Sequence, residues 1–86
     1  MKRRLRDGIR TAAAGGELTV YDGNADTVHV LNATGAFILE THRAGKTVAE
    51  IETMLKDAFS LDPGKDLKPE IRRFLGDLKK RKIFLP

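Results

Sequence analysis

The sequence contains no cysteine, which excludes disulfide bridges, thiolate metal sites and thiol-based catalysis. It also has no apolar run that approaches the roughly 20 residues needed by a membrane-spanning helix. The basic N-terminus is followed by Gly15, Gly16 and Glu17, which interrupt the apolar stretch that a secretory signal requires. We therefore expect a cytoplasmic protein that neither crosses nor is anchored to a membrane.

Residues suited to catalysis or metal binding are also scarce. His29 and His42 are the two histidines, and neither has His, Cys or carboxylate partners at the spacing of a metal site. The hydroxyl residues fit turns, helix caps and surfaces. We interpret Glu40, Glu50 and Glu52 as solvated helix carboxylates rather than as an acid/base pair. The sequence therefore predicts no catalytic residue, no metal and no cofactor.

A short Ala-Gly-Lys-Thr run at residues 44–47 is similar to the end of a nucleotide-binding P-loop. A P-loop requires a glycine at the position of Glu40, and it follows a strand, whereas this run follows a predicted helix. We interpret Gly45 as a helix C-cap and Thr47 as the N-cap of the next helix. Nucleotide binding is therefore not predicted here.

The chain has 86 residues, which is enough for one small domain with one core. Sixteen Lys and Arg residues exceed twelve Asp and Glu residues, and the formal net charge is +4. The excess lies near the two ends, at residues 2–10 and 72–82. Such clusters suit nucleic acid, acidic lipid or acidic peptide, although a solvated basic surface is commoner. We predict a flexible basic arm at residues 1–8 and a single domain at residues 9–86.

Two segments alternate apolar and polar residues with the two-residue period of a half-buried strand. They are residues 17–22 and 27–32, and a Gly-Asn-Ala-Asp turn sequence separates them. The pair predicts an antiparallel hairpin that turns near Gly23 and Asn24. Residues 8–13 could supply an earlier strand, although their alanines have low β propensity.

After Asn32 the apolar residues recur at helical spacing. Asn32 is a favourable N-cap, and Gly45 is suited to the end of this first helix. Thr47 and Glu50 have the spacing of a capping box, which predicts the start of a second helix. A third helix is predicted to begin near Pro69, because proline is tolerated in the first turn. The apolar stripes of the three helices predict a shared core.

The predicted order of elements is two or three strands followed by three helices. This order indicates a winged-helix-like α+β domain, in which helices cover one face of a small antiparallel sheet. So few strands cannot close into a barrel, and the strand at residues 27–31 should form an open edge. Such an edge could also pair with a second copy of the chain and produce a homodimer.

Two functions without catalysis fit this architecture. In the first, the basic third helix binds DNA as part of a winged helix, and the arm adds phosphate contacts. Glu70 and Asp77 within that helix, and the shortage of side chains that read bases, argue against nucleic acid. In the second, the open strand edge captures an extended peptide by β-augmentation. Backbone hydrogen bonds would supply affinity, and a groove beside the third helix would supply specificity.

Three motifs occur in a characteristic order along the chain. They are VHVLNATGAFILE at 28–40, GKTVAEIETMLKDAF at 45–59 and EIRRFLGDLKKRKIFL at 70–85. Together they resemble the PqqD family, whose members are also called recognition elements for ribosomally synthesised and post-translationally modified peptides (RiPPs). The resemblance covers roughly residues 17–85 and implies a fold of three strands and three helices. The alanine-rich first strand and the basic arm depart from the family pattern.

The resemblance implies a peptide-binding function without catalysis. Family members bind the leader segment of a ribosomally made precursor peptide and present it to a modifying enzyme, often a radical SAM protein. The leader would add as a strand beside residues 27–31 and lie against the helix at residues 69–82. The implied partners are therefore the precursor peptide and a radical SAM or other RiPP-modifying enzyme.

The predicted peptide-binding site combines this strand and this helix. Alternation places two valines on one face of the strand and the other three residues on the opposite face, and either face could meet the core. On the helix, some of the charged residues that flank the apolar stripe are expected to line the groove, where they could pair with acidic leader residues, and the alternative for each is an ordinary solvated helix charge. The predicted site consists of Thr27, Val28, His29, Val30, Leu31, Arg72, Arg73, Asp77, Lys80 and Arg81.

Overall fold

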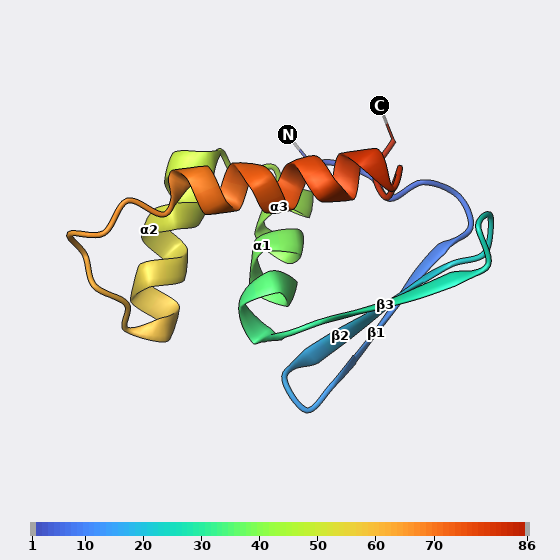
Figure 1. The fold of residues 1–86 in the computed structure, drawn as a ribbon, viewed down its shortest axis with the longest axis horizontal. Helices are drawn as coiled ribbons and strands as arrows, with labels where there is room; N and C mark the ends of the chain where they lie inside the picture. Colours follow the sequence, from blue (N-terminus) through green and yellow to red (C-terminus); the bar gives the residue numbers. More distant parts are fainter. Residues whose placement is uncertain (1, 86) are drawn as a thin grey trace.

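The computed structural model describes residues 2–85 of the chain. Its elements are β1 (Ile9–Ala14), β2 (Glu17–Asp22), β3 (Thr27–Leu31), α1 (Ala33–Arg43), α2 (Val48–Phe59) and α3 (Lys68–Lys80). Figure 1 shows the strands as one twisted layer and α3 running across the helical side, past α1 and towards the sheet. The predicted α+β order of two or three strands followed by three helices is confirmed, and the sheet has three strands.

The sheet is antiparallel, with the strand order β1-β2-β3. The first strand, expected near residues 8–13, forms at Ile9–Ala14 and pairs with the whole length of β2, so that Ala14 lies opposite Glu17. Its two-residue turn consists of Gly15 and Gly16, whose φ angles are 59° and 82°. Positive φ at both central residues is the geometry of a type I′ hairpin turn, which glycine adopts without strain. The turn therefore compensates for the low β propensity of the neighbouring alanines.

The second hairpin turn extends from Gly23 to Asp26, because Asp22 lies opposite Thr27 in the β2–β3 register. The Asp22 carboxylate accepts the backbone N–H groups of Asn24 at 2.9 Å and Ala25 at 3.2 Å. Burial alone would raise the pKa of Asp22, but these hydrogen bonds and the nearby Arg6 guanidinium lower it overall. The buried Asp22 is therefore held as a carboxylate, and it organises the predicted turn.

The predicted caps of α1 and α2 are confirmed. Asn32 Oδ1 accepts the backbone N–H of Gly35 at 2.8 Å. Thr47 and Glu50 form a reciprocal capping box, and Gly45 after α1 has a φ of 94°. These contacts satisfy donors and acceptors that each helix end leaves without an intrahelical partner.

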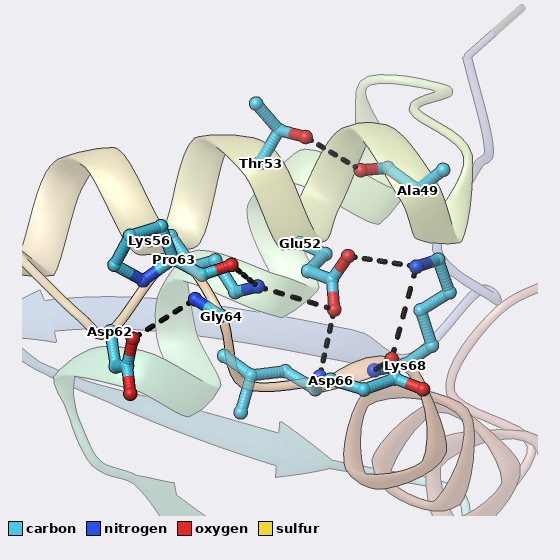
Figure 2. A network of polar contacts seen from close by, with 10 residues as sticks. Ala49, Glu52, Thr53, Lys56, Asp62, Pro63, Gly64, Asp66 and Lys68 are labelled. Atoms are coloured by element: carbon cyan, nitrogen blue, oxygen red, sulfur yellow. Dashed lines mark hydrogen bonds and ion pairs between the residues drawn. The ribbon is translucent and has the colours of Figure 1, made fainter.

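The start of α3 is held by a residue of α2 rather than by its own cap. The N-cap position is Leu67, which has no side-chain cap. Its backbone N–H donates to Glu52 Oε2 at 2.7 Å, and Lys68 Nζ donates to Glu52 Oε1 at 2.9 Å. Figure 2 shows Lys56 and Lys68 converging on Glu52 beside the loop of residues 60–67. Lys56 also donates to the carbonyl of Pro63 at 3.0 Å and so holds this loop.

The interpretation of Glu52 as a solvated carboxylate is therefore wrong. Its side chain is buried, and the residue is only 8 % exposed. A buried carboxylate requires charged or N–H donors, and these donors come from Lys56, Leu67 and Lys68. Periodicity within α2 could not reveal them, because two of the three lie outside that helix.

Two apolar clusters form the core, and α3 contributes to both. One lies between the sheet and the helices and includes Val20, Leu39 and Leu78. The other lies among the three helices and includes Ile51 and Ile71. Because Ile71 and Leu78 belong to opposite ends of α3, the two clusters fix the direction of this helix relative to the sheet.

Residues 1–8, predicted as a flexible arm, have defined partners over the part that the structure describes. Leu5 forms an antiparallel bridge with Phe84, and the Arg6 N–H donates to the Ile83 carbonyl at 2.9 Å. Leu5 also packs against the sheet-side cluster. The boundary between arm and domain stays a prediction, but these contacts connect the arm to the core.

The end of α3 differs from the predicted range of 69–82. The helix ends at Lys80, and Lys82 has a positive φ of 54°. This left-handed residue turns the chain so that Ile83 is buried and Phe84 pairs with the arm. The helix ends early because the C-terminal segment pairs with the N-terminal segment. A helix that continued to residue 82 would carry Ile83 and Phe84 away from Leu5 and the core.

Candidate functional site

The strand β3 forms an open edge of the sheet, as predicted. Within the strand order β1-β2-β3 it pairs with β2 alone. Over the described part of the chain, no Cα atom of α3 lies within 8 Å of a Cα atom of β3. Because helix and strand do not pack backbone to backbone, space remains between them beside the unpaired edge.

This space is a groove of about 350 Å³ between β3 and α3. Its apolar lining includes Val20, Leu78 and Ile83, which are buried, and Phe74, which is half-buried. The groove therefore has an apolar floor beside a row of backbone hydrogen-bonding groups. Such a combination suits an extended polypeptide, which presents both backbone amides and alternating side chains.

The structure decides which face of β3 meets the core. His29 and Leu31 are half-buried, and they lie opposite the buried Val20 and Leu18 of β2. Val28 and Val30 border the groove, yet each is 59 % exposed. The face formed by Thr27, His29 and Leu31 is therefore the helix-facing side, and the two valines belong to the outer side of the sheet.

Arg81 crosses the groove from the end of α3 to β3. Its Nη1 lies 2.6 Å from Nδ1 and 3.1 Å from Nε2 of His29. Arginine has only donors, so an unprotonated nitrogen of His29 accepts this bond. Asp77, one helical turn earlier, also lines the groove. The groove thus contains one acidic and one basic side chain beside its apolar floor.

The structure brings together six of the ten residues predicted for the site. These are Val28, His29, Val30, Leu31, Asp77 and Arg81. Thr27, Arg72, Arg73 and Lys80 do not line the groove, and all four are exposed. The helical period explains the division on α3, because residues 74, 77, 78 and 81 share one face whereas 72, 73 and 80 point elsewhere. A role for these four residues stays a prediction.

Sequence reasoning missed several residues that shape the groove. Phe74, Leu78 and Ile83 do not belong to the predicted site, yet all three line the groove. Gly35 does not belong to the predicted site either, yet a Cβ there would lie 3.3 Å from the Phe74 ring and 3.4 Å from Leu31 Cβ. Glycine therefore allows α1 to begin close against this end of the groove. The sequence does contain a signal for this face of the helix. Phe74, Asp77, Leu78 and Arg81 are three or four positions apart, which places them on one side of a helix.

Within residues 2–85, no group of three histidine or carboxylate side chains is placed to hold a metal ion. None of the helices in this range has the length and apolar character needed to cross a membrane.

Comparisons with known proteins agree with this architecture. A model of the PqqD family, described as coenzyme PQQ synthesis protein D, matches residues 17–83. The structure of TbiB1 in complex with the TbiA(β) leader peptide superposes with a TM-score of 0.77, at 23 % identity, covering 94 % of this chain and 93 % of that one. A lasso peptide synthetase B1 complexed with its leader peptide gives a TM-score of 0.81, at 24 % identity, over 100 % of both chains. At this identity the two likenesses show the fold. No curated protein sequence matches significantly.

Proposed function

Because the chain belongs to the PqqD family, we propose that it binds the leader segment of a ribosomally synthesised precursor peptide and presents it to a modifying enzyme. The observation that carries this proposal is the open edge of β3 facing a groove whose other wall is α3. Two similarly folded proteins have been solved with leader peptides bound, which supports the same use of the fold here.

The leader adds as a fourth strand beside β3. Backbone groups of β3 that do not pair with β2 supply the hydrogen bonds, and these bonds require no particular leader sequence. Every second leader side chain then faces α3, where Phe74, Leu78 and Ile83 favour apolar residues. Specificity therefore comes from the groove, and affinity comes largely from the strand edge.

Arg81 sets the charge preference of the groove. Its guanidinium is hydrogen-bonded to the ring of His29. An acidic leader side chain would be a stronger acceptor, because a carboxylate carries a full negative charge and can accept two parallel N–H bonds from the guanidinium. The leader is therefore proposed to carry a carboxylate opposite Arg81, which releases His29 when it binds.

A separate enzyme is proposed to carry out the chemistry. Of the residues that line the groove, only His29, Asp77 and Arg81 are ionisable, and His29 and Arg81 are engaged with each other. The family resemblance predicts a radical SAM protein as this enzyme, whereas one similar structure is a lasso peptide synthetase component. Co-purification with each modifying enzyme encoded near this chain's gene would identify the partner.

A nuclear magnetic resonance titration tests the proposal. A synthetic leader from the neighbouring precursor gene is added to the ¹⁵N-labelled protein, and a scrambled peptide of equal composition serves as the control. We expect amide shifts at residues 28–31 and 74–81, together with new cross-strand contacts between the leader and β3. Shifts confined to residues 2–8 would contradict strand addition.

Salt dependence separates peptide binding from the DNA-binding alternative. Affinity for duplex DNA falls steeply as salt rises, because phosphate contacts release counterions. Leader affinity based on backbone hydrogen bonds and apolar contacts should change much less over the same range. Replacing Arg72 and Arg73 by Gln should weaken DNA binding, whereas leader binding should persist because neither side chain lines the groove.

A further inference from the structure

A second and larger cavity lies on another face of α3. It has a volume of about 850 Å³, and its apolar part is formed by Leu75, Gly76, Phe84 and Leu85. Its α3 residues are at positions 75, 76 and 79, whereas the leader groove uses positions 74, 77 and 78. The two cavities therefore share one helix but none of its side chains.

No side chain of residues 2–85 packs closely enough against Gly76 to require a glycine there. Gly76 lies inside α3, where glycine is destabilising relative to alanine because it loses more backbone freedom. A Cβ placed on Gly76 would meet no atom within 4 Å. Gly35, by contrast, is packed against Phe74 and Leu31. Gly76 thus costs stability without permitting any close contact, and its effect is to leave this cavity deeper.

Basic side chains surround the cavity. Arg3, Arg6, Lys79 and Lys82 line it, and no acidic residue does. Arg3 donates to the His42 carbonyl at 2.8 Å, and Arg6 lies 3.6 Å from the Asp22 carboxylate. Within residues 2–85, neither Lys79 nor Lys82 has a carboxylate within ion-pair distance. These two lysines therefore present positive charge outward, beside the apolar floor.

His42 completes one wall of the cavity without adding charge. Its ring packs edge-on against Phe84, with the ring centroids 5.0 Å apart. Burial lowers the pKa of His42, and the nearby Arg3 guanidinium lowers it further. The neutral form is therefore favoured at neutral pH, and the positive field of the cavity comes from its Arg and Lys side chains.

We propose that this cavity docks the modifying enzyme, through a segment in which an apolar side chain is flanked by Asp or Glu residues. The floor accepts the apolar side chain, and the lysines pair with the carboxylates. The proposal rests on the proposed function for the identity of the enzyme. It places the enzyme and the leader on two faces of the same helix, so that the enzyme meets the leader as it emerges from the groove.

The charge of the cavity argues against other occupants. A second copy of this chain has a net charge of +4 and would bring like charge to a basic rim, which costs binding energy. A nucleic acid backbone would pair with the lysines but would leave the apolar floor of Leu75, Phe84 and Leu85 unused. An acidic protein segment with an apolar side chain satisfies both parts of the cavity.

Two variants test the docking site. Lys79→Glu reverses one rim charge, and Gly76→Leu fills the cavity with a residue that favours helix. Lys65→Glu is the matched control, because it makes the same charge change on an exposed loop outside both cavities. Binding of the purified modifying enzyme from the same gene cluster is measured by biolayer interferometry, and leader binding by fluorescence anisotropy.

We expect Lys79→Glu and Gly76→Leu to weaken enzyme binding about tenfold or more, and Lys65→Glu to change it less than about twofold. Leader affinity should stay within about twofold for all three, since none of these side chains lines the leader groove. Gly76→Leu should also raise the melting temperature, because leucine favours helix more than glycine does. If the fold required glycine at this position, the same substitution would lower the melting temperature. The docking proposal would be overturned if Lys79→Glu and Lys65→Glu reduced enzyme affinity equally. It would also be overturned if neither of these two variants reduced enzyme affinity.

Two outcomes distinguish this proposal from its premise. If the wild-type protein fails to bind the leader, the proposed function is wrong whatever the enzyme does. If the leader binds normally but sedimentation velocity shows a dimer that Gly76→Leu abolishes, the cavity is occupied by a second copy and the enzyme docking site is wrong.

Discussion

At the scale of single residues, Glu52 of α2 holds the start of α3, the helix that forms one wall of the groove beside β3. It accepts the Leu67 N–H and the Lys68 ammonium at the start of α3. The hydrogen bond from Lys68, followed by that from Leu67, lowers the pKa of Glu52 to about 2. Because α3 has no side-chain cap of its own, this carboxylate takes part in fixing where the helix begins.

The first prediction concerns Glu52→Gln. The folded-state pKa is about 2 and the ordinary value is 4.5, so the ionised group stabilises the fold fully above about pH 4.5. That contribution is lost as the pH falls from 4.5 towards 2, because the unfolded state then binds more protons. We expect Glu52→Gln to lower stability at pH 7 and to flatten the dependence on pH in this window.

Urea unfolding between pH 2 and pH 7 measures this effect. Glu40→Gln is the matched control, because Glu40 is exposed and has only a 4.0 Å contact with Arg43. Surface pairs of this kind contribute little, so the control should follow the wild-type curve. Parallel curves for the wild type and Glu52→Gln would show that the buried carboxylate does not supply the acid dependence.

At the scale of elements, the backbone N–H groups of β3 alternate in direction, so that some hold the sheet together and others are free to bind a peptide. In an antiparallel pair, successive residues direct their N–H groups alternately towards the partner strand and away from it. One of the N–H groups of His29 and Val30 therefore pairs with β2, and the other faces the open edge. A proline removes this donor and is tolerated only where the N–H faces outward.

The second prediction follows from comparing His29→Pro with Val30→Pro. One variant should unfold at lower temperature, because it breaks the β2–β3 ladder. The other should fold like the wild type and lose leader affinity about tenfold, since a strand hydrogen bond is missing and the proline ring blocks the edge. Circular dichroism and fluorescence anisotropy measure the two properties.

Alanine at the same two positions is the control, because it keeps the backbone N–H. His29→Ala also removes the contact with Arg81, so it separates the loss of the ring from the loss of the N–H. Strand addition at β3 would be refuted if both proline variants folded normally and bound the leader with wild-type affinity.

At the scale of the whole molecule, the two ends of the chain form part of one structure. Figure 1 shows the N-terminal segment running beside the end of α3, close to the C-terminal segment. The Leu5–Phe84 bridge joins them, and the Leu85 N–H donates to the Arg4 carbonyl at 2.9 Å. Both terminal segments also contribute residues to the proposed docking cavity. The basic ends of the sequence therefore meet at one place.

The third prediction tests whether the N-terminal segment contributes to the core. Leu5→Ala should lower the free energy of unfolding by about 1–3 kcal/mol, because Leu5 packs against the sheet-side cluster. Arg4→Ala, on an exposed neighbour, should change it by less than about 0.5 kcal/mol. Denaturant unfolding measures both. A fully mobile arm would give the two variants equal and negligible effects.

Local chemistry accounts for what could be predicted without coordinates. The order of elements depends on periodicity. The Asn32 cap and the Thr47–Glu50 capping box depend on hydrogen bonds between residues three positions apart. The open edge of β3 follows from a meander of consecutive strands that is too small to close into a barrel. Such signals are complete within a short window of sequence. For this reason the fold class and the binding strand were predicted from composition and pattern together with the family resemblance.

Contacts between residues far apart in the sequence account for the features that could not be predicted. The face of β3 that meets the helices, the subset of α3 charges in the groove and the burial of Glu52 all depend on how helices pack against the sheet. Arg81 and His29 are 52 positions apart, and Lys68 and Glu52 are 16 apart. Periodicity identifies an apolar face of each element but does not state which neighbour covers it. Packing therefore determined the side chains of the leader groove and of the second cavity, whereas the sequence pattern determined the elements that carry them.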